Sequence, residues 1–150
     1  MKRIGWGFVV CLLLAPALYA LDVQVGSSFK ITGIRREENR LVLPVERSKY
    51  YNVRILQRGT LQYVQQCQEP CVQELTSVEP RVLDIRSAQS RPDMWIAHVS
   101  FGGAWQITFL VFKNGKQFSV KSPKHFMFLD KKLQTATQQI ILEALKQETP

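Results

Sequence analysis

The feature that most constrains the fold is the alternation of apolar and polar residues between Leu21 and about Phe128. The stretch FKIT at 29–32 is typical of it. A period near two places successive side chains on opposite faces of a strand, and turn residues recur roughly every eight to twelve residues, as in all-β domains. We therefore predict a mainly β fold, an antiparallel β-sandwich or barrel-like domain, with one C-terminal amphipathic α-helix.

Two hairpins are expected in the first half of this region. The charged segment Arg35–Arg40 would form the tip of the first, with a returning strand over 41–46. Pro44 has no backbone N–H to donate, so this returning strand is expected at a sheet edge. The second hairpin would join strands 51–55 and 61–63 across a short Arg-Gly-Thr loop.

The clearest local signal is the apolar stretch Trp105–Val120, interrupted by Asn-Gly at 114–115. Asn-Gly tolerates the positive φ of a type I′ turn, so a two-residue loop there would pair Val111 with Phe118. Apolar side chains occur on both faces of the first strand, which indicates a central strand covered on both sides. Its buried face is predicted to consist of Trp105, Ile107, Phe109 and Val111.

Two further strands are expected at 82–85 and 95–101, the second of which ends at a Gly-Gly pair. The segment Ser87–Asp93 between them is rich in turn-forming and charged residues, and is predicted to be a loop.

The C-terminal segment has helical spacing. Asp130 is a good N-cap residue, and we expect a helix over about 130–147. An apolar stripe follows at helical positions: Leu129, Leu133, Ala136, Ile140, Ala144 and Leu145. This stripe either packs on the domain's own sheet or docks on a partner through Leu133, Ile140 and Leu145.

Residues 1–20 have the layout of a secretory signal peptide. Lys2 and Arg3 precede a short apolar run, and small residues lead to cleavage sites after Ala17 or, as we favour, Ala20. An uncleaved anchor is the alternative reading. Residues 21–150 would then form a single domain with no transmembrane segment, in a periplasmic or secreted setting.

Two cysteines remain after removal of the signal peptide, Cys67 and Cys71 in the sequence CQEPC. A disulfide is the default outcome for one cysteine pair in an exported chain, and Pro70 helps the chain to turn between them. A thiol-redox or copper-carrier role is the alternative. The CxxxC spacing resembles that of copper-delivering proteins of the thioredoxin class, which would add a distant His98 or His125, but the parallel βαβ pattern of that class is missing.

The sequence shows no other group of residues that is recognisable as a catalytic site. His98 and His125 are isolated and are expected to be surface or rim side chains. The carboxylate pairs Asp84 with Asp93 and Glu37-Glu38 lack a general-acid environment, and the glutamates sit among arginines. No GxSxG, HExxH or phosphate-loop motif occurs. We therefore predict a protein that is not an enzyme and has neither a cofactor nor a metal site.

The chain is basic. It has 20 Lys and Arg against 12 Asp and Glu, a net charge of +8 that falls to +6 once Lys2 and Arg3 are removed. Two groups of basic residues surround the expected hairpins: Arg35, Arg36, Arg40, Arg47, Lys49, Arg54 and Arg58 in one, and Lys113, Lys116, Lys121 and Lys124 in the other. They could contact a partner or a polyanion such as a glycan or lipid head group, whereas lysines at strand edges also keep sheets from aggregating. Nucleic acid is disfavoured because no aromatic residues are regularly interleaved with them.

These features lead to three hypotheses. The first is a non-enzymatic exported binding or assembly module, such as an accessory subunit of a bacterial envelope complex for secretion or conjugation, whose edge strands and helix suit β-augmentation or groove docking. The second is a periplasmic enzyme inhibitor or immunity protein that uses the loop closed by Cys67 and Cys71. The third is the thiol-redox or copper-carrier protein.

Overall fold

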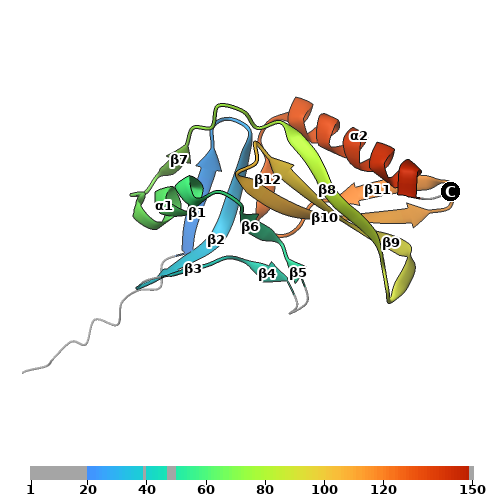
Figure 1. Cartoon of the computed structure of the whole chain (residues 1–150), viewed down its shortest axis with the longest axis horizontal. Coiled ribbons are helices and arrows are strands. Elements are labelled where there is room, and N and C mark those ends of the chain that lie inside the picture. Colours follow the sequence, from blue (N-terminus) through green and yellow to red (C-terminus); the bar gives the residue numbers. More distant parts are fainter. Residues whose placement is uncertain (1–19, 39, 47–49, 149–150) are drawn as a thin grey trace, which may run out of the picture.

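Two five-stranded sheets that pack against each other make up most of the structure (Figure 1). The computed structural model describes residues 20–148 except 39 and 47–49. The predicted fold class, mainly β and sandwich-like with a C-terminal helix, is confirmed. The predicted signal peptide lies outside the described residues apart from Ala20, which begins the first strand. In the described part of the chain, no helix is long and apolar enough to cross a membrane.

The first sheet, sheet I, has the order β12-β2-β1-β7, with β3 also paired to β2. Its pairs are antiparallel except for β1 with β7, which is parallel. Its strands are β1 (Ala20–Val25), β2 (Phe29–Glu37), β3 (Arg40–Val42), β7 (Cys71–Gln73) and β12 (Phe126–Phe128).

The second sheet, sheet II, has the order β11-β10-β9-β8, with β6 also paired to β10, and is antiparallel throughout. Strand β10 is central, as predicted, and its expected inner face is fully buried. The strands are β6 (Val53–Ile55), β8 (Pro80–Ala88), β9 (Arg91–Phe101), β10 (Trp105–Asn114) and β11 (Gln117–Lys121). A separate small hairpin joins β4 (Val45–Glu46) to β5 (Tyr50–Tyr51).

The β10–β11 hairpin exists, but its predicted register is wrong. The loop starts at Gly115 rather than Asn114, and Val111 pairs with Val120 instead of Phe118. Of the two loop residues only the glycine has a positive φ, 65°. This is the pattern of a type II′ turn, which favours glycine at its first central position. Because the pairing shifts by two residues, every side chain stays on its predicted face.

The predicted strand at 61–63 is also wrong, because the chain forms helix α1 (Arg58–Gln66) there. Thr60 and Val64, four residues apart, are the buried residues of this helix. Tyr63 and Cys67 pack against the core as well, which completes an i, i+3, i+4, i+7 pattern. The alternation of Leu61 and Tyr63 fits a strand equally well locally, and burial of the helical set decides the outcome.

Two predicted loops are shorter than expected. The segment Ser87–Asp93 is mostly strand, because β8 and β9 continue to a turn at Gln89-Ser90. The charged tip at 35–40 is likewise mostly strand, since β2 runs to Glu37 and β3 begins at Arg40. Strand β3 pairs only with β2 among the described strands, which agrees with the predicted edge position.

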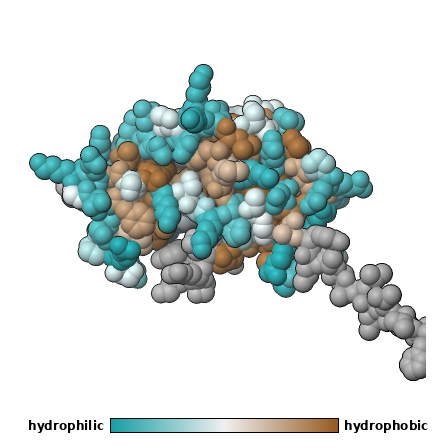
Figure 2. Space-filling model, turned by 180° about the vertical axis from the view of Figure 1, so that it is seen from behind, coloured by the Kyte–Doolittle hydropathy of each residue, from teal (hydrophilic) through white to brown (hydrophobic). Residues whose placement is uncertain are grey.

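Phenylalanine rings join the two sheets. Phe29, Phe126 and Phe128 of sheet I meet Phe101 and Phe109 of sheet II, with the Phe29 and Phe101 ring centroids 5.2 Å apart. The ring pairs are stacked, tilted or edge-on, and such pairs stabilise a core beyond the burial of their apolar area. On the surface seen in Figure 2, hydrophobic side chains lie in patches separated by hydrophilic ones.

Helix α2 (Lys131–Glu148) lies along β8 (Figure 1). The Asp130 carboxylate accepts a hydrogen bond from the Lys132 N–H at 2.9 Å, so the predicted N-cap is present. The buried stripe is rotated from the predicted one and consists of Leu133, Thr137, Ile141 and Leu145. Of the residues expected to dock on a partner, Leu133 and Leu145 are buried and Ile140 is partly buried in the domain's own core. They therefore form no part of the function proposed below.

A buried polar bridge connects both sheets and α1. The Gln73 side chain, on β7 of sheet I, accepts a 2.9 Å hydrogen bond from Trp105 Nε1 on β10 of sheet II. Its amide donates to Thr60 Oγ1 on α1 at 3.1 Å. All three side chains are at least nine-tenths buried. A buried polar group that loses its partner costs about 1–3 kcal/mol, so the bridge fixes the relative positions of three elements.

We predict that Gln73→Leu lowers the free energy of unfolding by roughly 2–4 kcal/mol, because it leaves the Trp105 N–H and the Thr60 hydroxyl without partners. Thr60→Val should cost less in the Gln73→Leu background than in the wild type, since the hydroxyl that it removes is already unpaired there. Urea denaturation of the two single variants and the double variant measures this coupling. Strictly additive losses would contradict the bridge.

Candidate functional site

A groove of about 730 Å³ opens between β3, β6 and α1. It combines an apolar floor with basic side chains. The groove residues are Arg40, Leu41, Leu43, Arg54, Ile55, Leu56, Gln57, Arg58, Leu61 and Gln65.

The groove exists because the two chain segments that extend from the β4–β5 hairpin, β3 and β6, do not stay paired. The hairpin ladder pairs Val45 with Tyr51, and a continuation would place Leu43 opposite Val53. The two chain segments separate instead, because β3 joins β2 in sheet I whereas β6 joins β10 in sheet II. The space between them is the groove, and α1 closes one side of it.

Three exposed arginines gather here: Arg40, Arg54 and Arg58. Arg40 Nε donates to the Glu37 carboxylate at 2.7 Å, so its charge is partly balanced. Among the described residues, no Asp or Glu side chain lines the groove itself. The site is therefore electropositive and should attract anionic groups.

The apolar floor is unusually open to solvent. Leu56 and Leu61 are 44% and 36% exposed, although large apolar side chains gain by burial. Leu41, Leu43 and Ile55 are partly buried and continue the floor toward the core. An occupant of this groove could thus bury apolar groups and meet arginines at the same time.

One edge of β6 faces the groove with unpaired backbone groups. The Leu56 N–H donates to the Ala104 carbonyl at 2.8 Å, and the Thr108 N–H donates to the Asn52 carbonyl. In an antiparallel pair, alternate residues point to the same neighbour, so the N–H and C=O of Ile55 point away from β10. No described residue hydrogen bonds to the Ile55 backbone.

The other predicted basic residues do not line this groove. Arg35 and Arg36 lie on β2, where Arg36 donates to the Gln65 carbonyl at 3.2 Å and so holds α1 near the groove. Lys113 and Lys116 lie near the far end of β10, about 30 Å from its first residue at 3.3 Å per residue. Lys113 there sits over the Phe118 ring. The remaining predicted basic residues are Lys121 at the end of β11, Lys124 beyond it, and Arg47 and Lys49, which fall outside the described residues.

The predicted disulfide between Cys67 and Cys71 is confirmed, with the two α-carbons 5.7 Å apart. It ties the end of α1 to the start of β7. The Tyr63 hydroxyl adds a 2.6 Å hydrogen bond to the Val72 carbonyl. Cys71 is buried, and no group of three or more His, Cys, Asp or Glu in the described part of the chain is placed to hold a metal ion.

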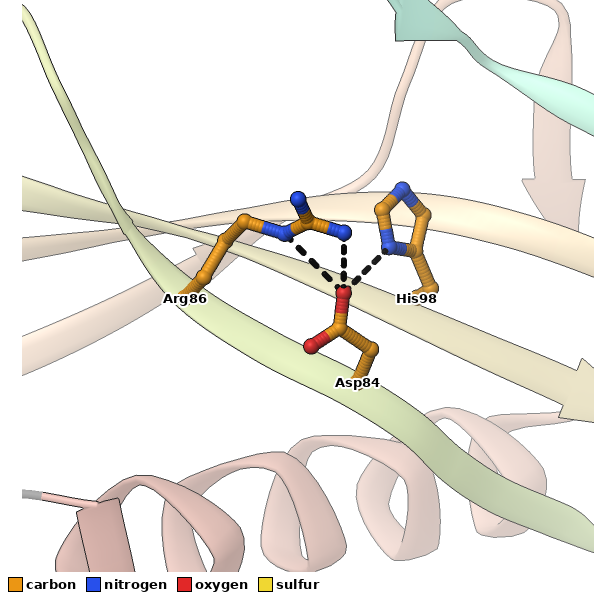
Figure 3. Close-up of polar contacts among 3 residues, drawn as sticks. All are labelled: Asp84, Arg86 and His98. Atoms are coloured by element: carbon orange, nitrogen blue, oxygen red, sulfur yellow. Dashed lines mark hydrogen bonds and ion pairs between the residues drawn. The ribbon is translucent and has the colours of Figure 1, made fainter.

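One candidate carboxylate, Asp84, and one candidate histidine, His98, form a separate cluster on sheet II. Figure 3 shows Arg86 and His98 converging on one oxygen of Asp84. The hydrogen bond from Arg86 holds the Asp84 pKa below its ordinary value. Burial lowers the His98 pKa, and the Asp84 carboxylate 3.5 Å from Nδ1 only partly offsets this. A charged carboxylate and a neutral imidazole therefore join β8 to β9 at neutral pH.

The other candidate residues are not brought into this cluster. Asp93 lies 3.6 Å from Arg91, an exposed pair. His125 is exposed, and its Nδ1 lies 3.3 Å from the Thr32 hydroxyl. The predicted carboxylate pair Asp84 and Asp93 is thus divided between two different arginine contacts.

Comparison with known proteins gives no match to a family model, a curated protein or a solved structure.

Sequence reasoning found the three groove arginines but missed the part of the groove made by α1. Leu61 and Gln65 belong to helix α1, whereas the sequence predicts a loop at 58–60 and a returning strand at 61–63. The helical spacing of Thr60, Val64 and Cys67 is the signal that could have revealed it.

The lowered His98 pKa gives a pH prediction. Below its ordinary pKa of 6.5, His98 takes up a proton more readily in the unfolded chain than in the folded one, so this residue lowers stability as the pH falls through 6.5. His98→Gln removes this effect. Its free energy of unfolding should therefore improve relative to wild type between pH 7 and pH 5, as measured by urea denaturation. A stability difference that stays constant over this range would contradict the assignment.

Proposed function

We propose that this chain is an exported, non-enzymatic binding module whose partner is another envelope protein, held in the groove between β3, β6 and α1. The observation that carries the proposal is the coincidence of three arginines, an exposed apolar floor and an open strand edge in one groove. Export is supported by the signal-like sequence at 1–20 and by the disulfide, which is typical of oxidising compartments.

Charge complementarity defines the partner as an acidic segment. No acidic side chain is among its described lining residues, and the carboxylate of Glu37 beside it is paired with Arg40. Apolar contacts supply affinity, whereas the arginines supply steering and selectivity. A role in assembling a secretion or conjugation complex fits a protein that carries such a surface and has no proposed catalysis.

The other two hypotheses have less support. Inhibition through the disulfide loop would use exposed residues at 68–70. Glu69 and Pro70 line a smaller cavity of about 420 Å³, but its charges are of mixed sign, and Lys30 there is paired with Asp22. A thiol-redox or copper role would need an accessible cysteine, whereas Cys71 is only 2% exposed and Cys67 is partly buried against the core.

Arg58 offers a sharp test because its positive charge lowers the stability of the fold but should strengthen partner binding. It is the first residue of α1, where a positive charge opposes the helix dipole. Arg58→Glu should therefore raise the free energy of unfolding by about 0.3–1 kcal/mol. The same variant should weaken partner binding about tenfold, because it places a carboxylate beside the groove. Lys116→Glu, which changes the net charge equally at the distant β10–β11 turn, is the matched control.

The measurement is site-specific photo-crosslinking in cells that make the protein. A benzoyl-phenylalanine at Leu61, in the groove, should give one protein adduct that disappears with Arg58→Glu and persists with Lys116→Glu. The same group at the exposed Met127 should not give it. Adducts that are equal from both positions, or unaffected by Arg58→Glu, would contradict the proposal, and a glycan or lipid adduct would replace the protein partner with a polyanion.

A further inference from the structure

We propose that the occupant of the groove is an extended peptide segment with alternating acidic and apolar side chains, which adds to the free edge of β6 as a further strand. This inference rests on the proposed function and names the chemistry of its partner. Three independent features of the groove lead to it.

The first feature is that the groove follows the edge of β6 rather than one of its faces. Arg54 pairs with Gln106 and lies on the outer face of sheet II, whereas Ile55 pairs with the buried Trp105 and lies on the inner face. Both residues line the groove. Side chains from opposite faces of one strand can border the same space only along its edge.

The second feature is the set of free backbone groups on that edge. The N–H and C=O of Ile55 point away from β10 and have no described partner, whereas the Leu56 N–H on the other edge is bonded to Ala104. An open edge is a template for strand addition, in which backbone hydrogen bonds provide affinity and alternate side chains provide specificity. The groove gives a strand room to lie there, since β3 and β6 separate at this point.

The third feature is the different chemistry of the two faces. Side chains of an added strand would alternate between the inner face, beside Ile55, Leu41 and Leu43, and the outer face, beside Arg54. Apolar residues suit the first set and carboxylates the second. Arg58 at the start of α1 extends the positive charge. The groove therefore selects an alternating sequence over a block of like residues.

The test uses synthetic peptides and isothermal titration calorimetry. The probe is an end-capped octapeptide of four Glu-Val repeats, and its controls are a blocked peptide of four Glu followed by four Val and an octapeptide of four Lys-Val repeats. The alternating acidic peptide should bind at least tenfold more tightly than either control. Equal binding of the alternating and blocked acidic peptides would mean a general polyanion site and would overturn strand addition.

Two N-methylated peptides test the backbone bonds without altering the protein. One carries N-methyl groups on the Glu residues and the other on the Val residues. Alternate residues of a strand point their N–H groups to opposite edges, so only one of these peptides should lose binding, by tenfold or more. Equal losses or no losses would overturn strand addition.

Ile55→Pro and Ile55→Ala form a matched pair on the protein side. Both shorten or replace the apolar side chain, but only proline removes the edge N–H, and proline is tolerated at such an edge. Ile55→Pro should bind the alternating peptide at least tenfold more weakly than Ile55→Ala. If the two variants bind equally while Arg58→Glu still abolishes the cellular crosslink, the groove is the binding site as proposed but strand addition is wrong. If Arg58→Glu leaves both the cellular crosslink and the peptide affinity unchanged, both proposals are overturned.

Discussion

The buried side chain of Gln73 holds together the three elements on which the groove depends. It receives a hydrogen bond from Trp105 of sheet II, belongs to β7 of sheet I, and donates to Thr60 of α1. Satisfied polar groups in a core are directional, so they fix positions that apolar contacts alone leave adjustable. The bridge adds a directional restraint to the covalent tie that the disulfide makes between α1 and β7. With it, the helix forms a fixed side of a groove that needs no rearrangement to receive a ligand, which reduces the entropy lost on binding.

The contacts around this bridge act in the same direction. The disulfide joins the end of α1 to β7, Tyr63 bonds to the Val72 carbonyl, and Arg36 bonds to the Gln65 carbonyl. Each contact holds α1 against sheet I, whereas β6 belongs to sheet II through its pairing with β10. The cysteine pair thus stabilises the groove but does not line it.

The sequence predicted those features that depend on local patterns. Alternation gave the β-rich class, helical spacing and Asp130 gave α2 nearly to the residue, and the close cysteine pair gave the disulfide. Features decided by long-range burial were missed. The segment that contains Leu61 fits a strand or a helix locally, and only the burial of Thr60 and Val64 against distant strands selects the helix. The buried stripe of α2 was likewise predicted on a face of the helix that is rotated from the observed one. Thr137 belongs to the observed stripe, and it enters the core because its hydroxyl donates to the Leu133 carbonyl.

The candidate site was predictable in composition but not in shape. The arginines could be recognised as a basic group, yet their meeting at a groove follows from β3 joining one sheet and β6 the other, which no local pattern encodes. Strand addition requires the β6 edge to be open in the free protein. Amide hydrogen exchange followed by NMR measures this by comparing neighbouring residues on opposite edges. We expect the Ile55 amide to exchange at least a hundredfold faster than the Leu56 amide, which is bonded to Ala104, since a hundredfold corresponds to about 2.7 kcal/mol of protection. Equal protection of the two amides would show that the edge is already paired and unable to receive a strand.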